Sequence, residues 1–445
     1  MTRANGKARP LRGRPGTTAL PLLGARAVGG PVAFGAFAAL AAVALVGWLA
    51  AAATLVAASP QIAARDPLAW QPVLAAHLVA LGLLPAAVSG ASFHLLPVML
   101  RNDVRRPRLL FALPVLLAGG FLVAPGIAFD VPALMWTGVI LVAGGFAVVL
   151  TELLGLVARA PHGRTLLASR TGVALACFHV AAAFVLGGAV FAHQDEPFAG
   201  VVHDRWLLVH IHLAVVGWLT LLIVTVGRTL GPMLALAPAA APRRLPVTEL
   251  VLCGGLWALI AGIAAGVWQA QLAGAAAIAA ALAGFAFAML RILGRRRVPL
   301  EGPLIHILSG VAFLAQAAVL GIAVVAGAVS PKRALTAYVV LLLVGWAAGV
   351  TLGHLGKLLS LSLWVWWPPG PRPKQEALYP RRLWRVEAGA FVVGVEVLAV
   401  GSLTGSGIAT RAGALSLLAA AVLAAVAASQ TLSRRPGRGS YAPPL

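Results

Sequence analysis

The chain has 445 residues, of which 60% are hydrophobic and only 10% are charged, and its mean hydropathy is +0.94. This composition excludes a soluble globular protein, because repeated apolar runs of about 20 residues are typical of membrane-spanning helices. The formal net charge is +22. The basic residues gather between the apolar runs, which argues against a nucleic-acid-binding protein.

In chain order, the apolar runs predict an all-α polytopic membrane protein with twelve spanning helices. The predicted spans cover residues 29–58, 71–100, 108–128, 132–158, 171–192, 206–235, 247–268, 270–293, 303–328, 333–362, 384–404 and 408–431. The shortest connection falls near Gln269–Gln271, where one tight turn must separate two helices.

The basic residues predict the orientation of the chain. With the N-terminus inside, only Arg65, Arg205, Lys332, Arg333 and Arg411 lie outside, and 29 of the 34 Lys and Arg residues lie inside. Since cytoplasmic loops carry the excess of Lys and Arg, we expect a multi-pass protein of the cell membrane, in contact with lipid, with both termini in the cytoplasm.

This orientation divides the chain into a basic tail at 1–28, a membrane domain at 29–432 and a second tail at 433–445. The first apolar run is long enough to span the membrane. We therefore expect the first tail to be cytoplasmic rather than a cleaved signal peptide.

A weak internal repeat runs through the predicted membrane domain. The segments around Gly82, Gly217 and Gly345 align, and these glycines are 135 and 128 residues apart. Self-similarity at a fixed period indicates repeated structural units. The alignment predicts three four-helix units at about 29–158, 171–293 and 303–431, with the second helix of each carrying the motif.

Three histidines lie at one depth near the outer ends of these helices. His77 and His212 each stand five residues before the aligned glycine; the third unit has Val340 there, and Tyr338 in place of His210. Unpaired imidazole nitrogens in hydrocarbon are costly, and heme iron or another metal removes that cost because imidazole is a common ligand. We therefore expect His77, His210 and His212 to bind a cofactor.

The spacing of His210 and His212 constrains this site. Each helical residue turns by ~100°, so the two side chains point about 200° apart. They are expected to face two sites on opposite sides of one helix. One of them would pair with His77 on a six-coordinate iron, and the other would serve a second heme or a different metal.

Four more histidines lie toward the inner ends of predicted spans. His94, His179, His306 and His354 are candidate metal ligands, since ionisable groups inside a membrane often have a function. Each also has a structural alternative. His94 and His306 suit an interfacial position, His179 suits helix packing, and His354 suits an inner polar patch with Lys357.

Glu396 lies near the middle of the eleventh predicted span. It is a candidate for a proton path, and the alternative is a protonated carboxyl group bonded to a neighbouring helix.

Two of the spans carry motifs of a known family. His210-Ile211-His212, with Pro232 placed 22 residues after the first histidine, resembles helix X of heme–copper oxidase subunit I. In that family, one histidine of the pair binds a low-spin heme and the other a high-spin heme. His77, with Ser89-Gly90-Ala91 and Pro97 downstream, resembles the family's helix II, which supplies the other low-spin ligand.

Spans 2, 6 and 10 also resemble an uncharacterised bacterial branch of that family, through HIHLAVVGW, Pro232-Met233 and HLGKLLS. Other features differ from the oxidases. The H-x-H motif stands on span 6, span 7 has no His-His pair, and span 6 has no tyrosine four residues after a histidine. Heme binding is therefore implied, whereas the oxidase copper site, oxygen reduction and proton pumping are not. NnrS-like heme and copper membrane proteins are a second similar group.

The resemblance implies a membrane hemoprotein with one or two hemes, and possible copper, in electron transfer or in the chemistry of NO or O2. Its partners would be other respiratory subunits or a cytochrome or quinol electron donor. Arg205, Lys332 and Arg333 lie at the face expected for heme propionates. The alternatives are a heme- or copper-handling transporter and an assembly or structural subunit of a respiratory complex. Whether the protein is an enzyme is left open.

Overall fold

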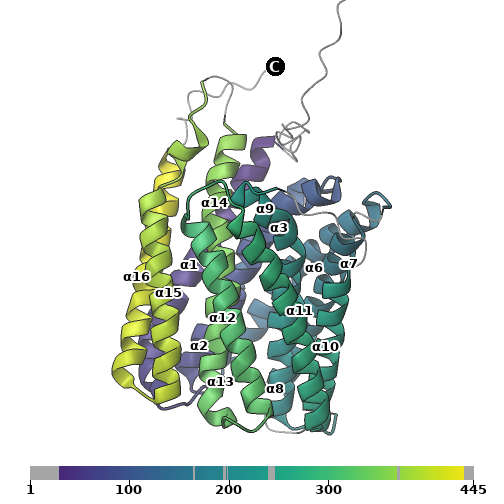
Figure 1. The fold of residues 1–445 in the computed structure, drawn as a ribbon, viewed down its shortest axis with the longest axis vertical. Helices are drawn as coiled ribbons and strands as arrows, with labels where there is room; N and C mark the ends of the chain where they lie inside the picture. Colours follow the sequence, from purple (N-terminus) through teal and green to yellow (C-terminus); the bar gives the residue numbers. More distant parts are fainter. Residues whose placement is uncertain are drawn as a thin grey trace, which may run out of the picture.

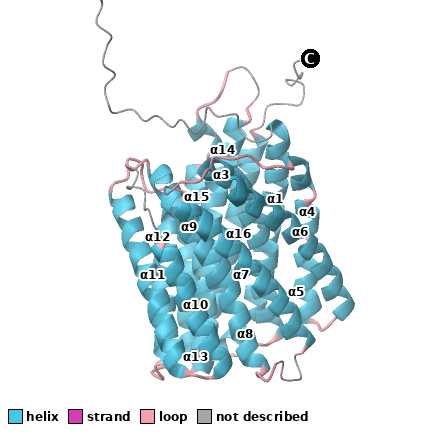
Figure 2. Ribbon diagram, turned by 90° about the vertical axis from the view of Figure 1, so that its right-hand side faces the viewer, coloured by secondary structure: helices cyan, strands magenta, loops and turns pink. Residues whose placement is uncertain are grey.

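A computed structural model describes residues 30–163, 166–193, 197, 199–238, 246–367 and 371–434. Within these ranges every regular element is a helix (Figures 1 and 2). Eleven of the helices that the structure describes are long and apolar enough to cross a membrane. The chain is thus a multi-pass membrane protein, as predicted. The first predicted tail and nearly all of the second lie outside the described residues.

The helices are numbered as in Figure 1. In chain order they are α1 (Gly30–Ala63), α2 (Trp70–His77), η2 (Leu78–Leu83), α3 (Leu84–Leu100), η3 (Pro107–Phe111), α4 (Leu113–Leu117), α5 (Gly120–Ala128), α6 (Pro132–Arg159), α7 (Leu167–Ala192), α8 (His203–His212), η4 (Leu213–Thr220), α9 (Leu221–Ala235), α10 (Val247–Ala265), α11 (Trp268–Gly294), α12 (Gly302–Val325), α13 (Pro331–Val339), η5 (Val340–Ala348), α14 (Gly349–Val365), η6 (Gln375–Leu378), α15 (Arg381–Thr404) and α16 (Gly407–Ser433).

The predicted third span is not one continuous helix. It divides into η3, α4 and α5, none of which is long enough to cross a membrane alone. Pro114 lies in the first turn of α4, where its missing N–H is tolerated, and α5 begins at the pair Gly119-Gly120. A Cβ on Gly120 would lie 2.4 Å from the carbonyl oxygen of Leu81, so the break lets the chain approach η2 closely. The count of twelve spans remains a prediction.

The tight turn expected near Gln269–Gln271 is present, slightly earlier in the chain. Helix α10 ends at Ala265 and α11 begins at Trp268. Gly266 has a φ of +72°, in the left-handed region that glycine adopts without strain. This turn separates the two helices that the sequence analysis placed on either side of it.

Three helix pairs pack through glycines at the same spacing. In each pair, two glycines seven residues apart are followed twelve residues later by a third glycine on the next helix. The sets are Gly119, Gly126 and Gly138 for α5 and α6; Gly255, Gly262 and Gly274 for α10 and α11; and Gly394, Gly401 and Gly413 for α15 and α16.

The contacts at these glycines also recur. A Cβ on the first glycine of each set would lie 2.9, 2.9 and 3.0 Å from the carbonyl oxygen of the third. Small residues of this kind let transmembrane helices approach closely, which favours van der Waals packing in lipid. The pair α15 and α16 lies side by side at the left of Figure 1, and α10 and α11 at the right.

Three continuous helices form the most buried part of the bundle. They cover Trp70–Leu100, His203–Ala235 and Pro331–Val365, and each contains a π-helical segment: η2, η4 or η5. Each π-helical segment contains one of the aligned glycines, Gly82, Gly217 or Gly345. Since π-helical segments are rare and are frequent at functional sites, these three helices are where a site is expected.

Candidate functional site

His212 ends α8, and its two ring nitrogens have different partners. Nδ1 lies 2.7 Å from the carbonyl oxygen of Leu208, so it carries the proton and donates it. Nε2 then accepts a hydrogen bond from the hydroxyl group of Tyr338 on α13, 3.2 Å away. His212 therefore faces the third of the buried helices.

His210, two residues earlier, faces a different element. Its Nδ1 lies 2.9 Å from the carbonyl oxygen of Ala183 on α7. Gly187 gives the ring its place, because a Cβ there would lie 2.7 Å from Cε1 of His210. His77 lies within electrostatic range of His210. The structure thus places His77 and His210 in one neighbourhood.

His77 ends α2 and shows the same local geometry as His212. Its Nδ1 lies 2.8 Å from the carbonyl oxygen of Val73, four residues earlier. His354 on α14 repeats the pattern with Val350 at 2.7 Å. A backbone partner at Nδ1 fixes the tautomer and leaves the lone pair on Nε2, as is usual for histidines that bind metal ions or heme. The donor chemistry of the outer histidines therefore fits heme iron.

The inner histidines do not form one cluster, although His306 and His354 interact with each other. His94 has its Nδ1 3.4 Å from the hydroxyl of Ser362, and His306 bonds Glu387. His179 is fully buried and interacts with the backbone of Leu175, one turn earlier, but neither ring nitrogen makes a hydrogen bond of full geometry. Its ring lies against Gly217, where a Cβ would be 2.8 Å from it. Among the described residues no group of three or more His, Cys, Asp or Glu side chains is arranged to hold a metal ion. As metal ligands, the inner histidines stay predictions.

An apolar cavity lies between the three buried helices. Its lining includes Ala91 and Leu95 of α3, Leu222 and Val226 of α9, and His354 of α14. A second cavity beside it also has His354 in its wall. His354 is therefore the polar side chain at the centre of the bundle that borders both spaces.

Glu396 is hydrogen-bonded to a neighbouring helix. Its Oε1 accepts a hydrogen bond of 2.7 Å from Nε2 of Gln316 on α12, and Gln316 is exposed. A role for Glu396 in a proton path stays a prediction.

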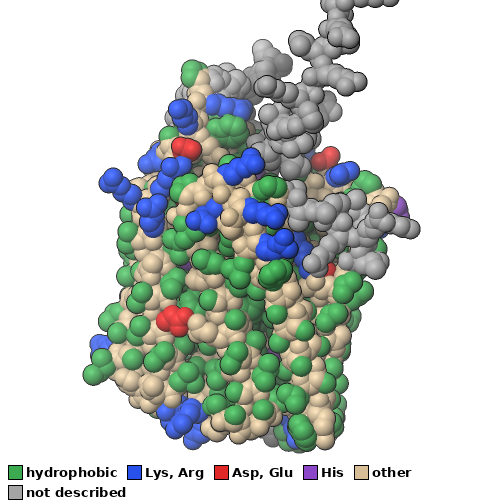
Figure 3. Space-filling model, viewed as in Figure 1, with side chains coloured by type: hydrophobic (Ala, Val, Ile, Leu, Met, Phe, Trp, Pro, Cys, Tyr) green, Lys and Arg blue, Asp and Glu red, His purple; other side chains and the backbone are tan. Residues whose placement is uncertain are grey.

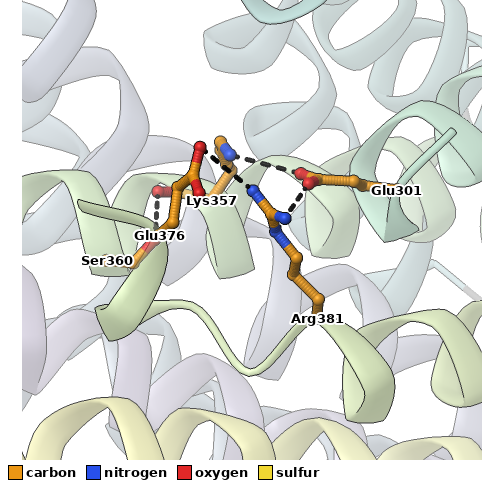
Figure 4. A network of polar contacts seen from close by, with 5 residues as sticks. All are labelled: Glu301, Lys357, Ser360, Glu376 and Arg381. Carbon is orange, nitrogen blue, oxygen red and sulfur yellow. Dashed lines mark hydrogen bonds and ion pairs between the residues drawn. The ribbon is translucent and has the colours of Figure 1, made fainter. Parts of the chain in front are cut away.

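A polar network lies at the upper end of the bundle in Figure 1, where α14 ends and α15 begins (Figure 4). Glu301, which precedes α12, accepts from Lys357 at 3.3 Å and from Arg381 at 2.9 Å. Arg381 also pairs with the exposed Glu376 at 3.3 Å. Lys and Arg side chains gather at this end on the face shown in Figure 3.

Tyr379 is a buried neighbour of this network and lies in the connection between α14 and α15. The amino group of Lys357 is 4.8 Å from the centre of its ring. Burial raises the pKa of the Tyr379 hydroxyl well above its ordinary value, and the carboxylates of Glu301 and Glu387 raise this pKa further. Tyr379 is therefore a neutral hydrogen-bond donor at physiological pH.

The sequence analysis missed Glu387, Tyr379 and Glu301. Glu387 follows a basic stretch, and its partner His306 is 81 residues away in the chain, so no local motif connects them. For Glu387, the signal in the sequence was the position of a glutamate within a predicted membrane span.

No protein-family model matches the chain, and no curated protein matches it. The fold defines it as a polytopic helical membrane protein, and its function must be argued from its own residues.

Proposed function

We propose that the protein is a membrane hemoprotein arranged like heme–copper oxidase subunit I, with three four-helix units and twelve spans. The recurrent glycine spacing of the three helix pairs and the three π-helical segments at aligned glycines support this arrangement. In this proposal it lies in the cell membrane with both termini in the cytoplasm. The lower end of Figure 1, with α2, α8 and α13, is then the outer side.

His77 and His210 are the residues that would hold one heme in this proposal. The observation that carries the proposal is that both donate Nδ1 to a backbone carbonyl, lie within electrostatic range of each other and keep Nε2 for a ligand. The sequence led us to expect that one histidine of the H-x-H motif pairs with His77, and this proposal gives that role to His210 rather than to His212, which lies at the depth of His77 in the alignment. The heme would supply a one-electron redox centre there.

His212 serves the opposite side of α8 in this proposal. The hydroxyl of Tyr338 donates a hydrogen bond to Nε2 of His212. A second heme or a copper ion at His212 would require Tyr338 to give up this hydrogen bond. Arg205 at the start of α8 is a candidate partner for heme propionates, since its side chain is exposed near Gly266. Electron transfer or the chemistry of NO or O2 is the proposed activity, with a cytochrome or quinol donor.

Cofactor analysis of the purified protein tests this function. The protein is expressed with adequate heme supply, purified in detergent, and assayed for extractable heme and for iron and copper by elemental analysis. Heme near one or two equivalents per chain is the expected result. Copper without heme would favour a metal-handling protein, and neither cofactor would favour a structural or assembly subunit.

A further inference from the structure

A buried acid–base pair joins α12 to α15 at one end of the bundle. Nε2 of His306 lies 2.8 Å from Oε2 of Glu387, and both side chains are fully buried. Glycines of α14 make room for the pair, because a Cβ on Gly353 would lie 2.7 Å from Cβ of His306. An acid–base pair so far from water is held only where its remaining polar atoms also find partners.

Four polar atoms in and around this pair are buried and have no partner in the protein. They are Nδ1 of His306, Oε1 of Glu387, the hydroxyl oxygen of Tyr379 and Nε1 of Trp384. The rings of Tyr379 and Trp384 are stacked, with an interplanar angle of 4°. Buried polar groups in native proteins are paired with protein or with ordered water. Donors and acceptors of this kind are the partners that an internal water takes.

The polar groups continue toward the surface. Tyr379 is in electrostatic contact with both Glu387 and Glu301. Glu301 pairs with Lys357 and Arg381, and Arg381 reaches the exposed Glu376 (Figure 4). The charged groups around Tyr379, other than Glu387 itself, are thus Glu301, Lys357 and Arg381.

The polar groups also continue toward the centre of the bundle. His354 is in electrostatic contact with His306 and borders the two apolar cavities. A series of groups that can exchange protons therefore runs from the surface at Glu376 to the cavities at His354.

We propose that His306 and Glu387 form an internal proton-binding site, which exchanges protons with the surface near Glu376 through Tyr379 and bound water. The pair shares one proton between Oε2 of Glu387 and Nε2 of His306. A proton that arrives at a water beside Glu301 passes to the hydroxyl oxygen of Tyr379, while Tyr379 gives its own proton to Oε1 of Glu387. The phenol and the water keep their charges, the pair gains one proton, and no electron moves. This site does not depend on heme.

Infrared spectroscopy of the protein in lipid nanodiscs tests the proposal. The buffer is changed from H2O to D2O, and the bands of Glu387 are identified by subtracting the spectrum of Glu387→Gln. Replacing the shared proton with a deuteron shifts these bands whether the carboxyl group is protonated or ionised. Tyr379→Phe keeps the ring and its stacking on Trp384 but removes the hydroxyl. Tyr338→Phe is the matched control, because it removes a hydroxyl at the other end of the bundle.

The Glu387 bands are expected to shift promptly in the wild type and in Tyr338→Phe. In Tyr379→Phe the shift should be slower by about tenfold or more, since a positioned proton donor speeds transfer by roughly 10²–10⁴-fold. Three results would overturn the proposal: no exchange in the wild type, equal exchange in Tyr379→Phe, or equal slowing in Tyr338→Phe. Circular dichroism spectra that match the wild type in both variants show that the helical fold is intact.

Discussion

The hydroxyl of Tyr338 donates a hydrogen bond to Nε2 of His212, although the two residues are 126 positions apart in the chain. A second hydrogen bond of the same separation joins Nε1 of Trp346 to the hydroxyl of Thr220 at 2.8 Å. These bonds connect the second and third of the buried helices along their π-helical segments. They hold the H-x-H motif against the helix that lacks it.

Tyr338→Phe should weaken this connection. The variant leaves Nε2 of His212 without its donor, so the free energy of unfolding should fall by about 0.5–1.5 kcal/mol. The heme proposed between His77 and His210 should be unaffected. Thermal unfolding and heme content of the purified variant check both points, and loss of heme would show that His212 is the ligand instead.

His179→Phe should be tolerated or stabilising. Neither nitrogen of the buried ring makes a hydrogen bond of full geometry, and the interaction with the backbone of Leu175 is weak, so replacing the ring with an apolar ring of similar shape should be close to neutral or favourable. Phe313 takes the equivalent place beside the aligned Gly345, where a Cβ would lie 2.8 Å from it. Melting temperature is the measurement. A clear decrease would mean that His179 binds something the structure does not contain.

The His306–Glu387 pair should show strong coupling in a double-mutant cycle. Glu387→Leu alone leaves His306 buried without its partner and should cost about 3–5 kcal/mol. Adding His306→Phe should recover much of that loss, because apolar replacements of similar volume are often neutral. If the loss of unfolding free energy in the double variant equals the sum of the losses in the two single variants, the contact is contradicted.

The recurrent glycines should be equally sensitive in all three helix pairs. Gly138→Val, Gly274→Val and Gly413→Val each place a side chain where a Cβ would already lie 2.4–2.6 Å from backbone atoms of the facing helix. All three should reduce the yield of folded protein in detergent. Gly254→Val is the control, since nothing lies within 4 Å of its Cβ position. Sensitivity in only one pair would argue against equivalent units.

The sequence predicted most of the helices because a segment in hydrocarbon must satisfy its own backbone, and long apolar runs are unambiguous. It did not show that the third predicted span is divided into short helices, because Pro114 and Gly119-Gly120 interrupt an apolar run whose hydropathy still resembles a span. The turn at Gly266 was placed within a few residues, since little room remained between two helices of the required length.

The depth of the outer histidines followed from the alignment, but their partners did not. Which way His210 and His212 point depends on the rotation of α8 against α7 and α13, which is set by contacts such as Gly187 on His210. The pair His306–Glu387 was also beyond the sequence, because only tertiary packing brings α12 and α15 together at that point.

The reduced-minus-oxidised optical spectrum of the purified protein tests the central claim most directly. We predict a heme α-band in the wild type that is lost in His77→Ala and in His210→Ala. The band should be retained in His94→Ala, which removes a histidine from the other end of the Trp70–Leu100 helix that carries His77. Absence of any heme band in protein expressed with adequate heme, or a band that survives in both His77→Ala and His210→Ala, would contradict the account.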